Sequence, residues 1–287
     1  MSYCLNNDCQ HRENSSQDQL CQSCGSKLLL RERYRAIKMI GQGCFGKTFL
    51  AVDNDKPSKP PCVIKPFFPS SQGTNSVEKA TELFHEEASR LEELGQHSQI
   101  PALLAHFEQE GNSYLVQEYI NGDNLAQELK TEGVFTEAKI KDLLLGLLPV
   151  VQFLHENNLI HRDIKPENII IQQENEEDKL FVVDFGAARY ATGTAILKTG
   201  TIIGDSLYIA PEHLLGKTNF TSDLYCLGVS CIHLLTGVDT FTLFSSYEDA
   251  WVWRDFLTTS VSDELGQILE KMVQKAIKTR FKTALEI

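Results

Sequence analysis

The chain has 287 residues, of which 42% are hydrophobic, so it is long enough for one large or two small domains with a substantial core. Its 39 acidic and 27 basic residues give a net charge of -12, which argues against nucleic acid as a main partner because phosphate binding requires basic patches. No apolar run approaches the roughly 20 residues of a membrane span, and the N-terminus has no signal-peptide pattern. We therefore expect a cytoplasmic protein whose eight cysteines are reduced thiols or metal ligands.

Residues 1–30 form a polar segment with too few apolar side chains to build a core, so we expect it to need a cross-link or a metal to fold. It contains four cysteines, Cys4, Cys9, Cys21 and Cys24. Their spacing of four and two intervening residues lies within the range of zinc-binding pairs, and His11 is a spare ligand. Zinc is the first interpretation, a redox switch in which the thiols form disulfides is the second, and a disordered tail is the third.

From Tyr34 onward the pattern changes to strands with a glycine turn. Strands are predicted over 34–40, 47–53, 60–67 and 112–120, and a helix over 76–94 with Gly95 as its stop.

The second half is predicted to be mainly helical. Thr136 is expected to cap a long helix that Pro149 interrupts and kinks, because proline removes one backbone hydrogen bond. Apolar residues at steps of three and four form its inner face, namely Ile140, Leu144, Leu147, Val151 and Leu154. The acidic stretch 172–179 is expected to be a solvated turn between two short strands, and helices dominate after Asp184. A strand-rich first half and a helix-rich second half predict an α+β protein.

The stretch GQGCFG, from Gly41 to Gly46, brings backbone N–H groups within reach of phosphate oxygens. This pattern alone is weak evidence. Because it lies between two predicted strands rather than before a helix, it does not fit a dinucleotide-binding fold and does fit a flap over ATP.

A more specific pattern is IHRDIKPENIII, residues 160–171, which places Asp163, Lys165 and Asn168 in one loop. The carboxylate can orient an attacking hydroxyl, the lysine can neutralise charge on the transferred phosphate, and the amide can bind Mg²⁺. Asp184 follows at the end of an apolar strand, where a carboxylate is costly unless a cation accompanies it.

Together these motifs resemble the eukaryotic-type (Hanks-type) protein kinase family, over about residues 34–287. The resemblance implies a bilobal fold in which a small antiparallel sheet with one main helix, residues 34–120, precedes a larger helical lobe, residues 121–287. The chain stops early in what resembles the last helix of the family, so we expect a truncated C-terminal lobe and further domains beyond residue 287.

The resemblance also implies roles for individual residues. HRDIKPEN is similar to the Ser/Thr branch of the family, which uses ATP with Mg²⁺ or Mn²⁺ to phosphorylate proteins. The implied catalytic residues are Asp163, Lys165, Lys65 and Glu87, with Glu86 as the alternative to Glu87. The implied nucleotide contacts are Gly41, Gly43, Gly46, Thr48, Val63, Lys65, Gln117, Glu118 and Ile120, and the implied Mg²⁺ ligands are Asn168 and Asp184. Asp223 resembles the aspartate that braces the catalytic loop, and Arg280 the partner of Glu212.

Asp205 stands where the family has a threonine that contacts the catalytic aspartate and lysine. A carboxylate there repels Asp163, which leaves a catalytically weak pseudokinase that acts as a nucleotide-binding scaffold as the alternative function. Thr199 and Thr201 are candidate phosphorylation sites, with Arg162 as the phosphate's partner. The four-cysteine segment resembles that of cyanobacterial Ser/Thr kinases, which implies a regulatory role. The protein substrate, activating signal and oligomeric state stay open.

Overall fold

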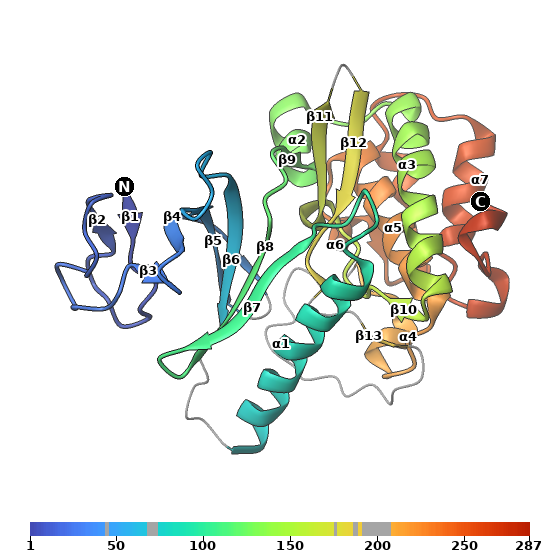
Figure 1. The fold of residues 1–287 in the computed structure, drawn as a ribbon. Helices are drawn as coiled ribbons and strands as arrows, with labels where there is room; N and C mark the ends of the chain where they lie inside the picture. Colours follow the sequence, from blue (N-terminus) through green and yellow to red (C-terminus); the bar gives the residue numbers. More distant parts are fainter. Residues whose placement is uncertain (44–45, 68–73, 175–176, 186–188, 191–207) are drawn as a thin grey trace. The chain divides into compact units, whose positions relative to one another are not determined.

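The computed structural model describes all residues except 44–45, 68–73, 175–176, 186–188 and 191–207 (Figure 1). The chain divides into two compact units, Met1–Ile120 and Asn121–Ile287, which are described separately below.

The first unit is built on a six-stranded antiparallel sheet with the strand order β3-β4-β5-β6-β8-β7 (Figure 1). Its strands are β3 (Leu29–Leu30), β4 (Tyr34–Gly43), β5 (Gly46–Asp53), β6 (Pro61–Phe67), β7 (Leu103–Gln109) and β8 (Asn112–Glu118). The ladder between β4 and β5 continues to the pair Gly43 and Gly46, so the glycine motif forms the tip of a hairpin. The two strands predicted on either side of the glycine motif are confirmed.

One long helix, α1 (Thr74–Leu94), packs against this sheet. The ring of Phe84 stacks on that of Phe67 in β6, with 5.3 Å between the ring centroids. The helix ends at Leu94, where predicted, and only glycine fits at the next position, because a Cβ atom at Gly95 would approach the Leu91 carbonyl oxygen to 2.4 Å. The contact between Phe84 and Phe67 determines which face of α1 is turned toward β6.

The cysteine segment is folded against this sheet. Its short strands β1 (Ser2–Tyr3) and β2 (Glu13–Asn14) pair with each other, and β1 also contacts β4. The segment has a small core of its own, made of Cys4, Cys9, Cys21 and Leu28. Three of these four core residues are cysteines and only one is an ordinary aliphatic residue. This composition agrees with the expectation that the segment has too few apolar side chains to build a core.

The second unit is mainly helical. Its helices are α2 (Leu125–Glu132), α3 (Glu137–Glu156), α4 (Pro211–Leu214), α5 (Phe220–Thr236), α6 (Thr240–Leu243) and α7 (Asp263–Met272). Its strands are β9 (Asp123–Asn124), β10 (Leu159–Ile160), β11 (Ile169–Glu174), β12 (Glu177–Val182), β13 (Arg189–Tyr190), β14 (Phe244–Ser245) and β15 (Ala250–Trp251). Single turns of 3-10 helix cover Pro166–Asn168, Trp253–Phe256, Ile277–Thr279 and Ala284–Glu286. Helix α5 is buried along nearly its whole length and forms the centre of the core.

Helix α3 agrees closely with the prediction. The Thr136 side chain accepts a hydrogen bond from the backbone N–H of Lys139, which satisfies one donor of the first turn. All five residues of the predicted inner face are buried. Pro149 lies inside this single helix, so the predicted interruption is wrong, and the predicted kink stays a prediction.

Most of the acidic stretch 172–179 belongs to two strands. Strands β11 and β12 pair through it, with Gln172 opposite Lys179 and Glu174 opposite Glu177. The three preceding isoleucines set the register, and the antiparallel ladder then continues into polar residues. The prediction of an eight-residue turn is therefore wrong.

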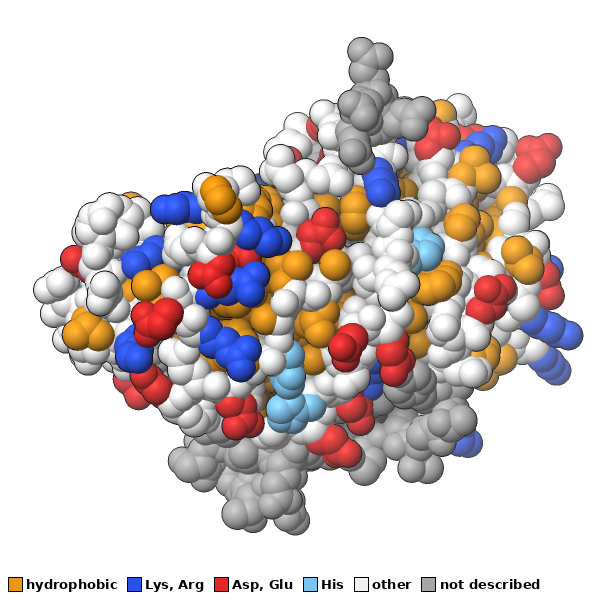
Figure 2. All heavy atoms as spheres, in the orientation of Figure 1, with side chains coloured by type: hydrophobic (Ala, Val, Ile, Leu, Met, Phe, Trp, Pro, Cys, Tyr) orange, Lys and Arg blue, Asp and Glu red, His pale blue; other side chains and the backbone are white. Residues whose placement is uncertain are grey.

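No helix in the described ranges is both long and apolar enough to cross a membrane. On the face drawn in Figure 2, the acidic and basic side chains of the described residues are interspersed.

Candidate nucleotide-binding and catalytic residues

In the first unit, Lys65 and Glu87 form a buried ion pair. The Lys65 Nζ atom donates to Glu87 Oε1 at 2.7 Å, and the Glu87 side chain is fully buried. Lys65 projects from β6 and Glu87 from α1, so the pair ties the helix to the sheet. The ion pair therefore holds the Lys65 side chain in a fixed position.

Glu86, the alternative partner, lies elsewhere. Its Oε2 atom accepts from Arg90 Nη2 at 2.5 Å, one turn along the same helix, and its side chain is 40% exposed. Of the two candidates for the lysine's partner, only Glu87 faces β6.

The residues expected around the nucleotide lie on adjacent strands. Val63 of β6 is buried and pairs with Gln117 of β8. The Oε1 atom of Gln117 is buried and has no hydrogen-bond partner among the described residues. A buried carbonyl oxygen without a donor is costly, which fits a position where a ligand supplies one.

The same strands continue the expected nucleotide wall. Thr48 of β5 pairs with Gly41 of β4, and a Cβ atom at Gly41 would meet only Thr48 Cβ, 4.0 Å away. Glu118 ends β8, where its backbone N–H donates to the Ala102 carbonyl at 2.9 Å. Ile120, two residues on, is buried.

In the second unit, Asp163 and Asn168 are joined by their side chains. The Asn168 Nδ2 atom donates to Asp163 Oδ2 and to the Asp163 carbonyl, both at 2.8 Å. Lys165 Nζ lies 3.3 Å from Asp163 Oδ1. Both carboxylate oxygens therefore have a cationic or amide neighbour, which holds the carboxylate in one orientation.

The loop that carries these residues is held by Asp223 of α5. The two Asp223 oxygens accept from the backbone N–H groups of His161 and Arg162, at 2.9 and 2.8 Å. Burial alone would raise the pKa of Asp223, but the hydrogen bond from His155 and the neighbouring groups hold it below its ordinary value. Arg162 has φ of 72°, a strained value for a side chain with a Cβ, and Asp223 helps to maintain it. The proposed bracing contact is present, and His155, at 3.0 Å from Asp223, is a partner that the sequence did not suggest.

Asp184 follows β12 and also has a left-handed backbone, with φ of 67°. The neighbouring residue Val183 donates its backbone N–H to the Asn168 carbonyl at 2.9 Å. The segments that carry Asn168 and Asp184, the two residues expected to bind Mg²⁺, are therefore joined by a hydrogen bond. The next residue, Phe185, is buried, with its ring centroid 4.9 Å from that of His161. These contacts bring Asn168 and Asp184 into one neighbourhood within the second unit.

A second buried ion pair stabilises the region after the catalytic loop. Arg280 donates to both carboxylate oxygens of Glu212, at 2.6 and 2.9 Å, and Ser222 donates to Glu212 Oε1 at 2.6 Å. Burial alone would raise the pKa of Glu212, but these donors lower it below its ordinary value. The pairing that the resemblance implied is present.

The four N-terminal cysteines converge. Their sulfur atoms all lie within 4.8 Å of one another. Cys4 Sγ is 3.6 Å from Cys24 Sγ, and Cys9 Sγ is 3.6 Å from Cys21 Sγ. The side-chain amides of Asn14 and Asn6 donate to the sulfurs of Cys21 and Cys24, at 3.6 and 3.7 Å.

The four thiols differ in pKa: burial raises the pKa of Cys4 and Cys9, whereas hydrogen bonds hold the pKa of Cys21 and Cys24 below the ordinary value. The hydrogen bond between the Cys24 sulfur and the Ser26 hydroxyl group, 3.3 Å apart, is the main cause that lowers the pKa of Cys24 to about 6. Burial acts in the opposite direction at Cys21, but backbone N–H groups of Cys24 and Ser23 still hold its pKa below the ordinary value. Thiolates are the form in which cysteine binds a metal.

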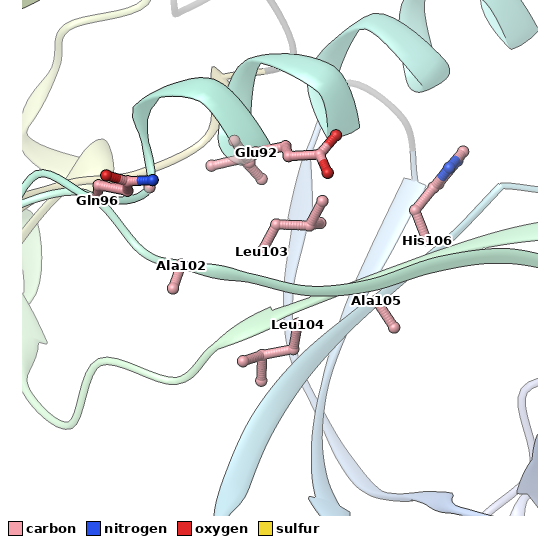
Figure 3. A pocket seen from close by; sticks show the side chains of 9 residues that line it. Glu92, Gln96, Ala102, Leu103, Leu104, Ala105 and His106 are labelled. Atoms are coloured by element: carbon pink, nitrogen blue, oxygen red, sulfur yellow. The ribbon is translucent and has the colours of Figure 1, made fainter.

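One pocket of the first unit lies away from these residues. It has a volume of about 570 Å³ between the end of α1 and β7. Figure 3 shows Glu92 and Gln96 projecting from the helix side and the stretch from Ala102 to His106 running along the other side. None of the residues predicted to bind nucleotide lines it.

Three predicted regulatory residues, Thr199, Thr201 and Asp205, lie outside the described residues. Gly43 and Gly46 pair with each other at the end of the ladder between β4 and β5.

A sequence model described as the protein kinase domain matches residues 34–287. The chain is 36% identical to serine/threonine-protein kinase B of Synechocystis sp., an alignment that covers 100% of this chain and 51% of that protein. It is 38% identical to serine/threonine-protein kinase PknA of Nostoc sp., over 90% of this chain and 47% of that protein. It is 40% identical to serine/threonine-protein kinase C of Synechocystis sp., over 89% of this chain and 49% of that protein. The chain thus spans about half the length of the curated relatives it matches, and it belongs to the protein kinase family.

Proposed function

We propose that this chain transfers the γ-phosphate of ATP to serine and threonine hydroxyl groups of proteins. The observation that carries the proposal is the contact between Asn168 and Asp163, in which one amide nitrogen holds the carboxylate that would receive the hydroxyl proton. The serine/threonine assignment follows the names of the matched relatives.

The proposed roles divide between the two units. In the first, Gly41, Gly43 and Gly46 offer backbone N–H groups to phosphate oxygens, and Lys65, fixed by Glu87, contacts the phosphates that stay behind. The adenine would lie against a wall formed by Thr48, Val63, Gln117, Glu118 and Ile120.

In the second unit, Asp163 orients the acceptor hydroxyl and Lys165 neutralises charge on the phosphate in transfer. Asn168 uses its amide nitrogen on Asp163, so its carbonyl oxygen is the atom suited to a hard cation, as is the carboxylate of Asp184. This donor set fits Mg²⁺, which when bound would neutralise charge on the ATP phosphates.

Transfer of labelled phosphate from ATP to a mixed Ser/Thr peptide library tests the activity. Asp163→Asn keeps the size of the side chain and removes the proton acceptor, so transfer should fall by about 10²–10⁴-fold. ATP binding that persists in the unchanged protein without any transfer would favour the nucleotide-binding scaffold instead. Transfer unaffected by Asp163→Asn would contradict the assigned role.

For the cysteine cluster we propose one Zn²⁺ ion. With Zn–S bonds of about 2.3 Å, a tetrahedral site separates its sulfurs by about 3.8 Å. The two sulfur pairs at 3.6 Å and the common limit of 4.8 Å are close to this arrangement. Two disulfides would instead shorten two separations to about 2 Å and leave the donated hydrogen bonds to sulfur without a role.

Metal analysis and thiol titration of the purified chain, with and without reductant, separate these possibilities. We expect one zinc per chain and four thiols that react only after chelation. Loss of four thiols on mild oxidation of metal-free protein would support the redox switch.

We also propose regulation by phosphorylation at Thr199 or Thr201, with Arg162 as the partner of the phosphate. Mass spectrometry after incubation with ATP tests this, because Thr199→Ala combined with Thr201→Ala should remove the modification.

A further inference from the structure

The cysteine segment is joined to the strands that carry the glycine turn. We propose that metal binding at the four cysteines and nucleotide binding at the glycine turn are coupled, so that the filled cysteine site raises the affinity of the first unit for ATP. This inference rests on the zinc site and the nucleotide role proposed above. Three sets of contacts, all within the first unit, support it.

The first set involves the neighbours of Cys4. Tyr3 places its ring 5.6 Å, centroid to centroid, from the ring of Phe49 in β5. Leu5 is buried in the core of the main sheet, which also contains Tyr34 and Phe49. Phe49 lies three residues after Gly46. A proposed metal ligand is therefore flanked on both sides by residues that cover the two strands of the glycine hairpin.

The second set centres on Arg35 of β4. Its Nη1 atom donates to Ser2 Oγ at 2.9 Å and to the Asp18 carbonyl at 2.8 Å, and the residue is only 9% exposed. Asp18 lies three residues before Cys21. A buried guanidinium without acceptors is costly, so Arg35 keeps both halves of the segment in place on β4, and they keep Arg35 in place.

The third set is a strand. Leu28 packs among the cysteine side chains, and the next two residues form β3, which pairs with Arg35 and Tyr34 of β4. Figure 1 shows β1, β2 and β3 beside β4. The sheet edge next to the glycine hairpin is thus built by the cysteine segment.

Removal of the metal should loosen all three sets together. The small core consists of three cysteines and one leucine, so without a metal it has little to hold the segment folded. Strands β4 and β5 would then lose Tyr3, Leu5 and the β3 pairing. Nucleotide binding would have to order a more mobile hairpin, which lowers affinity.

Coupling of this kind is reciprocal: the metal strengthens nucleotide binding by the factor by which the nucleotide strengthens metal binding. We expect a factor of about 10, within the usual range for coupled sites.

The test measures the affinity of a fluorescent ATP analogue for the 287-residue chain, zinc-loaded and after chelation, always with reductant. Chelation should weaken binding by about 10-fold. Hydrogen exchange of the Ala36 and Phe49 amides in nucleotide-free protein is the second readout, and it should accelerate when zinc is removed.

Arg35→Met keeps the aliphatic part of the side chain and removes the guanidinium group that bonds Ser2 and Asp18. The variant should retain one zinc per chain, bind the analogue more weakly, and lose most of the further effect of chelation. Arg12→Met is the matched control, since Arg12 donates to the Asn7 carbonyl within the segment. It should respond to chelation as the unchanged chain does. Ser2→Ala, which removes one of the two acceptors, replaces Arg35→Met if that variant does not fold.

The outcomes separate the inferences. One zinc per chain with analogue affinity and exchange unchanged by chelation would overturn the coupling and leave the zinc site standing. A chain that binds no zinc would overturn both. Loss of phosphate transfer with the coupling intact would contradict only the proposed activity, because the readouts here are binding and exchange.

Discussion

Arg280 and Glu212, 68 residues apart, form a two-point ion pair in which both side chains are almost completely buried. The pair joins the start of α4 to the C-terminal part of the chain, and Ser222 adds a third hydrogen bond from α5. Removing one member of such a pair leaves the other charge buried without a counterion.

Glu212→Gln should therefore lower the free energy of unfolding by about 3–5 kcal/mol. Urea unfolding monitored by circular dichroism measures this. Lys275→Met is the control, because Lys275 pairs with Asp249 at 2.7 Å but both side chains are more than half exposed. That substitution should cost less than about 1 kcal/mol. If both variants lowered the free energy of unfolding equally, the burial of the Arg280–Glu212 pair would contribute nothing to stability.

The Lys65–Glu87 pair predicts a difference between two adjacent glutamates. Glu87→Gln removes the charge that positions Lys65, so phosphate transfer should fall by up to about 100-fold. Glu86→Gln weakens the contact with Arg90 on the same helix and should leave transfer nearly unchanged. Steady-state transfer at saturating peptide compares them. A larger loss of phosphate transfer in the Glu86 variant would show that Glu87 is not the residue that positions Lys65.

Asn168 has two proposed functions, since its nitrogen holds Asp163 and its oxygen would bind Mg²⁺. Asn168→Ala should lower transfer and also raise the Mg²⁺ concentration needed for half-maximal rate, by about 10–100-fold. Titration of the rate with Mg²⁺ separates these effects. Asn157→Ala is the control, because the Asn157 amide donates only to the Phe153 carbonyl at the end of α3. An unchanged Mg²⁺ requirement in Asn168→Ala would limit the residue to positioning Asp163.

The parts of the fold that the sequence predicted are those with strong local signals. The glycine turn between two strands, the cap at Thr136 and the apolar face of α3 each depend on a few neighbouring residues. Helix α3 continues through Pro149, although proline removes one backbone hydrogen bond. The extended pairing of β11 and β12 was missed because polar residues carry no period-two pattern.

The contacts that depend on distant segments could not be predicted by such local rules. Nothing in the sequence around Arg35 indicates that its guanidinium lies against Ser2 and Asp18. The bond between His155 and Asp223 likewise joins residues 68 positions apart. The cysteine spacing predicted ligand capacity, but the sharing of a core with the glycine-bearing strands appears only in the folded chain.

Buried histidines predict how stability depends on pH. Burial is the main cause that lowers the pKa of four histidines, His106, His161, His213 and His233. In the unfolded chain a histidine has a pKa of about 6.5, so below that pH the unfolded state binds more protons than the folded state. The contribution of these histidines to the free energy of unfolding should be fully present above about pH 6.5. It should fall as the pH drops further, by at most about 1.4 kcal/mol per pH unit for each histidine.

The depressed pKa values of Asp223 and Glu212 affect stability only at lower pH, because their stabilisation is lost only below the ordinary carboxyl range. Urea unfolding at pH 7.5, 6.5 and 5.5 measures the slope, and His213→Asn should flatten it by removing the contribution of one histidine. Equal free energies of unfolding at the three pH values would show that these side chains take up protons as readily in the folded chain as in the unfolded one.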